Sequence, residues 1–218
     1  MLSMIDNNTS VLTNQLSTTQ EEFWAGAFGD DYIDRNVGES LIASNIALFS
    51  GVMRYTSDVQ SILEFGPNIG LNLIALHSLL PRATMTGVEI NTKAYSVLKT
   101  LNFVEAINKS FLNVSLDRKW DFVFTKGVLI HQSPDVLNQV YERLYKYSNR
   151  YIFLCEYYNP TPLEISYRGH SSVMYKSDFA GEIMDMYSDL TLVDYGFVYH
   201  RDCTFPGDDV NWFLLEKE

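Results

Sequence analysis

The sequence predicts an α/β fold built on a doubly wound, mainly parallel, seven-stranded sheet. Two observations lead to this prediction. From residue 58 onward, short apolar strand patterns alternate with helical patterns, and the last two strand patterns follow each other without a helix between them. Alternation favours parallel pairing, because each helix returns the chain to the same edge of the sheet. The two consecutive strands indicate a C-terminal antiparallel hairpin.

The first four strands are expected where apolar runs of strand length occur. The helix after the first strand ends at Pro81, because proline cannot continue a helix. Asn91 can cap the helix that follows the second strand. The expected strands are Ser61–Phe65, Thr84–Ile90, Val104–Asn108 and Trp120–Phe124, and the expected helices are Gly70–Leu80 and Lys93–Leu101.

The second half opens with a favourable helix start. Ser133, Pro134 and Asp135 offer a capping hydroxyl, a proline at the first position and an acid in the first turn. A fifth strand, a helix and the two hairpin strands are expected after it, over Tyr151–Cys155, Asp178–Met186, Leu190–His200 and Asn211–Glu216.

Residues 1–57 differ in character and are expected to form a helical extension of the α/β unit in residues 58–218. Residues 1–20, rich in Ser, Thr, Asn and Gln, are expected to fray. Ser40–Tyr55 carries apolar residues at helical spacing. The extension therefore holds at least one helix.

Composition narrows the class of partner. The formal net charge of -11 argues against nucleic acid, because binding to a polyanion depends on basic side chains. Cys155 and Cys203, with four histidines, show no metal-ligand spacing, so no metal is expected. The N-terminus is polar and no apolar run approaches about 18 residues, so neither a signal peptide nor a membrane span is expected. We expect a cytoplasmic protein that acts on a small molecule.

A glycine-containing turn follows the first strand. Gly66 lets the backbone approach a ligand closely, and Asn68 tolerates a positive φ angle. Glu89 lies about twenty residues past the turn, where a Rossmann-like fold places the acid that binds ribose hydroxyls. Glu64 can accept a hydrogen bond from an ammonium group. An adenosine-bearing cofactor fits this pattern, and the alternative is a plain strand–turn–helix with surface acids.

At these residues the chain resembles the class I S-adenosylmethionine-dependent methyltransferases. Glu64-x-Gly66-x-x-x-Gly70 matches their first motif and Asp121–His131 their fourth-strand motif, although Asn68 replaces the usual central glycine. A dinucleotide enzyme would need Gly-x-Gly-x-x-Gly instead. The resemblance implies that residues 58–218 are the methyltransferase domain, that the cofactor is S-adenosyl-L-methionine and that the product is S-adenosyl-L-homocysteine. The candidate cofactor-binding residues in this domain are Glu64, Gly66, Pro67, Asn68, Gly70, Glu89, Ile90, Ser110, Phe111 and Lys126, and the N-terminal segment adds Trp24, Tyr32 and Arg35.

A narrower resemblance extends over nearly the whole chain. The segments that carry it are similar to those of the pseudaminic acid biosynthesis-associated methylases. This family is linked to nonulosonic sugar pathways, so the resemblance implies a sugar-derived acceptor. The matching segments are Phe23–Gly26, Tyr32–Asn36, Thr125–His131, Glu156–Pro162, Tyr167–His170 and Asp208–Trp212.

The acceptor is expected at the loop Glu156–His170, which is longer than a usual strand–helix connection. Its tyrosines offer flat faces for a sugar ring, and Arg168 can fork onto a carboxylate. Alternatively, this loop is a rigid surface segment whose tyrosines pack on the sheet. The connection Arg201–Trp212 is expected on the same rim, or as a solvated turn. The candidate substrate-binding residues are Tyr157, Tyr158, Asn159, Arg168, His170, His200, Asp208, Asp209 and Trp212.

His131 and Glu156 are the candidate catalytic bases. His131 follows the fourth strand, near the expected point of methyl delivery, and an imidazole can take a proton from the acceptor. The alternative is a structural histidine that holds a loop carbonyl. Glu156 ends the fifth strand and either acts as the base or pairs with Arg168.

The aromatic segment Phe23–Asn36 is expected to fold over the cofactor as a lid. Trp24 and Tyr32 would cover the ligand, and Arg35 would meet the methionine carboxylate. The alternative is a helix pair packed on the sheet edge, with Arg35 in a salt bridge.

The leading prediction is methyl transfer to an oxygen or nitrogen of a small molecule, namely a nonulosonic sugar or its precursor. One alternative is a methyltransferase that acts on another small molecule, a protein or RNA. A nucleotide-sugar dehydrogenase or epimerase is a second, and the missing third glycine disfavours it. A third is a non-catalytic cofactor-binding or interaction module.

Overall fold

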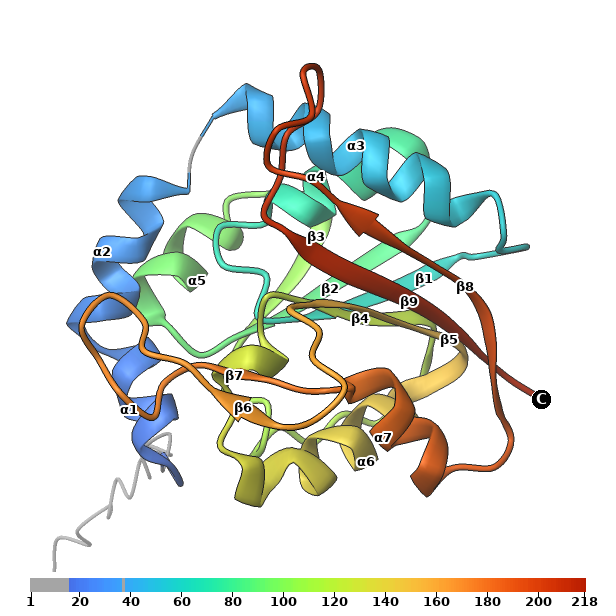
Figure 1. Ribbon diagram of the computed structural model, residues 1–218. Helices are drawn as coiled ribbons and strands as arrows, with labels where there is room; N and C mark the ends of the chain where they lie inside the picture. The colour runs from blue at the N-terminus through green and yellow to red at the C-terminus, as the bar shows by residue number, and fades with distance from the viewer. Residues whose placement is uncertain (1–15, 37) are drawn as a thin grey trace, which may run out of the picture.

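The computed structural model describes residues 16–36 and 38–218. Its main sheet has seven strands in the order β3-β2-β1-β4-β5-β9-β8 (Figure 1). Strands β1 to β5 are parallel, whereas β9 runs antiparallel to both β5 and β8. The predicted fold class is therefore confirmed. The strands are Ser61–Phe65 (β1), Thr84–Glu89 (β2), Val104–Asn108 (β3), Trp120–Lys126 (β4), Ser148–Glu156 (β5), Leu190–Val198 (β8) and Val210–Lys217 (β9).

Helices cover both faces of the sheet, as expected for parallel strands that are buried on both sides. In β5, Ile152 and Leu154 join the core cluster under α6 and α7, whereas Phe153 and Cys155 join the cluster under α3, α4 and α5. Figure 1 shows these two helical layers above and below the strands. The helices are Glu39–Met53 (α3), Leu71–Leu79 (α4), Thr92–Leu98 (α5), Leu137–Tyr147 (α6) and Phe179–Met186 (α7).

Two short helices precede α3, namely α1 (Thr19–Ala25) and α2 (Ala27–Arg35). Thr18 caps α1: its hydroxyl accepts the N–H of Glu21, and the Glu21 carboxylate accepts the N–H of Thr18. The expected fraying of residues 1–20 falls largely on residues 1–15, which lie outside the described residues. Residues 18–20, by contrast, form the cap and first turn of α1.

The chain between β5 and α7, residues 157–177, forms an arm. It contains a short antiparallel pair, β6 (Leu163–Glu164) and β7 (Tyr175–Lys176), which the sequence pattern did not predict. In Figure 1 the arm lies beside α1 and α2, and a hydrogen bond from Gln20 Nε2 to the carbonyl oxygen of Ser172 (2.9 Å) joins them.

Most predicted elements begin or end a few residues away from the observed ones. Ser133 makes no capping hydrogen bond; Pro134–Val136 forms a 3₁₀ turn, and α6 begins only at Leu137. Asn91 does cap α5, since its Oδ1 accepts the N–H of Ala94 (2.8 Å). Strand β8 ends at Val198, so His200 lies in the β8–β9 loop. Within residues 16–36 and 38–218, no helix is long and apolar enough to cross a membrane.

Candidate functional site

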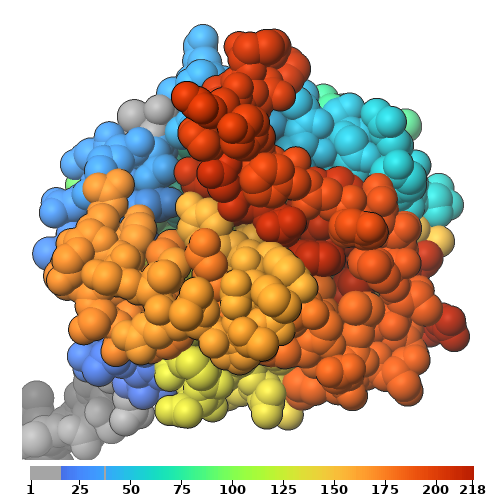
Figure 2. Space-filling model, in the orientation of Figure 1, coloured from blue at the N-terminus to red at the C-terminus, as the bar shows by residue number. Residues whose placement is uncertain are grey.

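A cavity of about 480 Å³ opens at the carboxyl ends of β1, β2 and β4. This edge is where ligands bind in open parallel sheets. The cavity is bounded by the glycine turn after β1, the ends of β2 and β4, the N-terminal helices and the β8–β9 loop. Figure 2 shows α2, the arm and the β8–β9 loop next to one another on one face of the molecule. Of the predicted site residues, those lining the cavity are Trp24, Tyr32, Gly66, Pro67, Asn68, Glu89, Ile90, Ser110, Phe111, Lys126, His131 and Asp208.

The glycine turn after β1 adopts the backbone conformation that the sequence predicted. Gly66, Asn68 and Gly70 have φ angles of +73°, +52° and +91°. A Cβ on Gly66 would lie 2.6 Å from Val128 Cγ2, so this position is closed to other residues. Gly70 caps α4 and packs against the α5 side, so it shapes the turn without lining the cavity.

Glu89 links the glycine turn to the loop after β2. Its carboxylate accepts the N–H of Asn68 (2.8 Å) and the N–H of Asn91 (2.7 Å). Burial raises the pKa of the Glu89 carboxyl, while the backbone hydrogen bonds oppose this rise. A carboxylate has about four acceptor positions, so these backbone N–H groups leave Glu89 able to accept from a ligand hydroxyl. Because Glu89 is only 6% exposed, it is not a surface acid.

Glu64 lies beneath the cavity and does not line it. Asn72 Nδ2 donates to Glu64 Oε1 (2.6 Å), and Asn72 itself lines the cavity. Burial raises the pKa of Glu64 to about 8, against the opposing effects of Asn72 and Lys126. Contrary to the prediction from the sequence, Glu64 therefore does not reach the cavity to contact an ammonium group directly. Asn72, which donates to Glu64, lines the cavity instead.

Three buried polar atoms of the cavity lining lack a hydrogen-bond partner among the described residues. They are Trp24 Nε1, Asn68 Oδ1 and Asn72 Oδ1. An unpaired buried donor or acceptor costs about 1–3 kcal/mol. Asn45 of α3, 7% exposed, also lines the cavity, and no hydrogen bond to its side chain is found in the described part of the chain. These groups suit a polar ligand.

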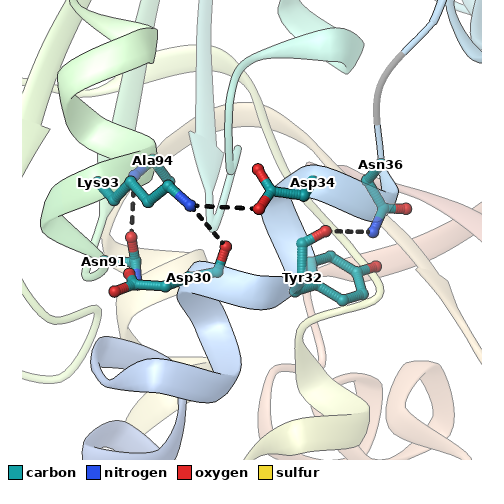
Figure 3. Close-up of polar contacts among 7 residues, drawn as sticks. All are labelled: Asp30, Tyr32, Asp34, Asn36, Asn91, Lys93 and Ala94. Carbon is teal, nitrogen blue, oxygen red and sulfur yellow. Dashed lines mark hydrogen bonds and ion pairs between the residues drawn. The ribbon is translucent and has the colours of Figure 1, made fainter.

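Helices α1 and α2 are docked over the end of β2 through Asn91. Asn91 Nδ2 donates to the carbonyl oxygen of Trp24 (3.2 Å) and to Asp30 Oδ1 (2.9 Å). Lys93 Nζ donates to the Asp30 carbonyl oxygen (3.2 Å) and pairs with Asp34 (3.5 Å), as Figure 3 shows. The lid segment thus lies over the cavity, with Trp24 and Tyr32 in its lining.

Arg35 does not reach the cavity lining. It is exposed, and its guanidinium carbon lies 5.4 Å from the Phe28 ring centroid and 5.8 Å from that of Tyr32. Among the described residues, neither a ligand-facing position nor a salt bridge of Arg35 is found. Arg35 instead packs against the aromatic rings of Phe28 and Tyr32 on α2.

The N-terminal helices also contact the arm. The Phe23 ring centroid lies 5.1 Å from that of His170, and the Phe28 centroid lies 5.9 Å from that of Tyr167. The hydroxyl of Ser110, at the end of β3, donates to the Glu21 carboxylate. These contacts close the cavity between the lid segment and the arm.

His131 lines the cavity and also holds the arm. Its Nδ1 lies 2.8 Å from the carbonyl oxygen of Val173, and its ring centroid lies 4.5 Å from that of Trp24. Because a carbonyl can only accept, Nδ1 carries the proton and Nε2 keeps a lone pair. Burial lowers the pKa of His131 to about 4, so the imidazole is neutral near pH 7. His131 therefore holds a loop carbonyl, which was the structural alternative for this residue. Its Nε2 remains available to accept a proton or a hydrogen bond.

Glu156 organises the loop after β4 and does not line the cavity. Its carboxylate accepts the N–H of Val128 (3.1 Å) and of Ile130 (3.4 Å). Burial raises the pKa of Glu156 to about 7, while these hydrogen bonds lower it. No ion pair joins it to Arg168 within the described residues. Glu156 thus positions His131 through the backbone of the loop.

The predicted substrate residues divide into two groups. Asp208 lines the cavity, and Tyr157 lies close enough that Asp208 and Tyr167 raise its pKa to about 12, after the larger effect of burial. The other predicted substrate residues do not line the cavity and are engaged by other parts of the chain. Two make polar contacts: Asp209 accepts hydrogen bonds from His200, and Asn159 donates to Thr161. The rest contact aromatic rings: Trp212 lies near Phe153, Tyr158 near Phe213, Arg168 over Tyr167, and His170 near Phe23.

Sequence reasoning missed several lining residues. Asn45 and Asn72 occupy helix positions that read as ordinary polar surface, and only the packing of α3 and α4 brings them to the cavity. Asn91 was recognised as a helix cap, but its side-chain amide also binds Trp24. No group of three or more potential metal ligands occurs among the described residues.

No protein-family model and no curated protein matches this chain. Solved structures share its fold. The plantazolicin methyltransferase BpumL, solved with S-adenosylhomocysteine, has a TM-score of 0.65 and 15% identity, covering 91% of this chain and 94% of that chain. The magnesium protoporphyrin IX methyltransferase ChlM from Synechocystis PCC 6803, also solved with S-adenosylhomocysteine, has a TM-score of 0.63 and 13% identity, covering 91% and 98%. Coclaurine N-methyltransferase, solved with N-methylheliamine and S-adenosylhomocysteine, has a TM-score of 0.59 and 12% identity, covering 73% and 52%. At these identities the likeness shows the fold.

Proposed function

We propose that this chain is an S-adenosylmethionine-dependent methyltransferase that acts on a small molecule. One observation carries the proposal: the buried carboxylate of Glu89 ties the glycine turn to the β2 loop at the edge of a cavity lined by unpaired polar groups. The fold shared with several methyltransferases supports it. A cytoplasmic location is part of the same proposal.

The cavity residues fit the two ends of such a cofactor. Glu89 would take the ribose hydroxyls, and Ile90 and Phe111 would flank the purine. The Phe111 ring is held flat against Phe65, with the centroids 3.8 Å apart. Asn72 and Lys126 would take the charged amino-acid end. When bound, the cofactor supplies an electrophilic methyl group on a sulfonium.

The protein's contribution to the reaction is to exclude water and to hold the acceptor in line. Trp24 and Tyr32 close the cavity from the lid side, and the arm is fixed to the site by the His131–Val173 hydrogen bond. Alignment of this kind supplies a large part of the rate in group transfer. Nε2 of His131 is an unprotonated nitrogen in the cavity lining, able to accept a hydrogen bond from the acceptor.

The identity of the acceptor is the finer part of the proposal. The solved structures that share this fold include a plantazolicin, a magnesium protoporphyrin IX and a coclaurine methyltransferase, so the fold itself does not select an acceptor. The resemblance of the matching sequence segments to those of the pseudaminic acid biosynthesis-associated methylases supports a nonulosonic sugar or its precursor as the acceptor. The tyrosines near the cavity mouth are compatible with a sugar ring.

Calorimetry of the full chain tests the proposal. We expect S-adenosylhomocysteine to bind and NAD⁺ not to bind, because the glycine turn lacks the dinucleotide pattern. Tight NAD⁺ binding without S-adenosylhomocysteine binding would favour the dehydrogenase alternative. A labelled-methyl assay across sugar intermediates then separates an enzyme from a non-catalytic module.

A further inference from the structure

Three tyrosines and one acid lie in or near the cavity lining. We call this region the rim and define it as Tyr32, Tyr157, Tyr167 and Asp208. Tyr32 and Asp208 line the cavity. Tyr157 and Tyr167 are close enough to Tyr32 to raise its pKa, and the Tyr167 ring centroid lies 5.4 Å from that of His131. The rim therefore lies beside the imidazole of His131.

Asp208 is distinguished from its neighbour by its lack of partners. The Asp209 carboxylate accepts the backbone N–H of His200 (3.0 Å) and contacts the His200 ring nitrogen Nδ1 (2.8 Å). Within the described residues, the Asp208 carboxylate has no hydrogen bond and no ion pair. The other two acids of the lining, Glu21 and Glu89, accept backbone N–H groups. Asp208 is thus the acid available to a ligand.

The charge of Asp208 acts on the rim tyrosines. After the larger effect of burial, it contributes to the raised pKa of Tyr32 and of Tyr157. Three cations already lie over the rim tyrosines: the Arg35 guanidinium over Tyr32 (5.8 Å), the Lys176 ammonium over Tyr157 (5.0 Å) and the Arg168 guanidinium over Tyr167 (5.7 Å). Aromatic faces and a carboxylate together favour a cation.

The groups near the rim are poor general bases for an alcohol. The imidazole of His131 has its pKa lowered to about 4, far from neutral pH, and the Glu156 carboxylate is bound to backbone N–H groups outside the lining. General-base catalysis is most effective when the pKa of the base lies near the working pH. An acceptor that is nucleophilic without general-base catalysis therefore fits this site better than an alcohol. An anionic acceptor would be repelled by the Asp208 carboxylate.

We propose that the rim binds a basic amine, so that the acceptor of this chain carries an amino nitrogen held between the tyrosine faces and Asp208. The inference rests on the proposed function. The amine arrives protonated and loses one proton to water. The nitrogen lone pair then forms the new C–N bond as the C–S bond breaks, and sulfur keeps that electron pair. The positive charge moves to nitrogen beside Asp208, until a second proton leaves to water.

The test measures binding of probe molecules to the full chain saturated with S-adenosylhomocysteine. Benzylamine is compared by calorimetry with benzyl alcohol, its uncharged counterpart, and with benzoate, near pH 7. We expect benzylamine to bind at least about fivefold more tightly than either, the factor of one partly exposed charge pair. In Asp208→Asn this preference disappears. In the matched variant Asp209→Asn it remains, because Asp209 is engaged by His200.

Equal affinity for benzylamine and benzyl alcohol, or an equal loss in Asp208→Asn and Asp209→Asn, would overturn the inference. Affinity for S-adenosylhomocysteine is measured in all three proteins and is expected to be the same. Wild-type protein that binds S-adenosylhomocysteine but shows no preference for the amine refutes the rim alone. If S-adenosylhomocysteine does not bind, the proposed function fails. The same probe molecules, measured without S-adenosylhomocysteine, then show whether the rim prefers an amine.

Discussion

The amide of Asn91 donates a hydrogen bond to the carbonyl oxygen of Trp24, 67 positions earlier in the chain (3.2 Å). This contact fixes the lid segment to the loop that follows Glu89, the last residue of β2. Trp24 and Glu89 both line the cavity, and Asn91 joins them, because its side-chain amide bonds Trp24 and its backbone N–H bonds Glu89.

Gly29→Ala tests this docking. A Cβ at Gly29 would lie 1.9 Å from the carbonyl oxygen of Trp24 and 2.9 Å from Asn91 Nδ2, so the helices must shift. We expect a loss of roughly 1–3 kcal/mol in stability and weaker binding of S-adenosylhomocysteine, measured by thermal unfolding and calorimetry. Gly51→Ala is the control, since its Cβ would meet nothing within 4 Å. Equal behaviour of the two variants would contradict the docking.

Glu89→Gln keeps the size of the side chain but replaces an accepting oxygen with a donating amide. One of the N–H groups of Asn68 and Asn91 then loses its acceptor. We expect a loss of about 1–3 kcal/mol in the free energy of unfolding, together with weaker binding of S-adenosylhomocysteine. Glu105→Gln, which removes a surface pair with Arg118, should cost less than about 1 kcal/mol. Urea unfolding of both variants compares the two losses.

The raised pKa of Glu64 predicts a pH dependence of stability. Between the ordinary carboxyl pKa of 4.5 and the folded-state pKa of about 8, the folded state keeps a proton that the unfolded state has lost. Stability should therefore fall as the pH rises through this window, by at most about 1.4 kcal/mol per pH unit from this group. Glu64→Gln should flatten the slope in urea unfolding between pH 5 and pH 8. An unchanged slope would show that Glu64 does not carry it.

His131→Ala should release the arm, because the Val173 carbonyl loses its donor. We expect a loss of about 1–3 kcal/mol in stability and faster proteolysis within residues 157–177. His131→Asn keeps a donor near the position of Nδ1 and should retain most of both properties. If Asn and Ala behave alike, the hydrogen bond to Val173 does not hold the arm.

The resemblance and the structure agree on the glycine turn and differ on its surroundings. Gly66, Asn68 and Glu89 could be identified in the sequence because the turn needs positive φ angles and the acid follows at a fixed distance. Arg35, Glu64 and Glu156 were expected to contact a ligand and lie outside the cavity lining. Sequence reveals residue type and spacing, but not which of two faces of a strand or helix meets the cavity.

The sequence by itself determined the alternation of strands and helices, the terminal hairpin and the turn at the start of α4, because each follows from local periodicity or from the φ angle that a residue tolerates. Only the tertiary structure decided that Asn45, Asn72 and Asp208 share one cavity, and that Glu64 and Glu156 are buried with raised pKa values. The physical reason is that burial and proximity arise from packing between segments that are distant in the chain. No local pattern records the distance between them.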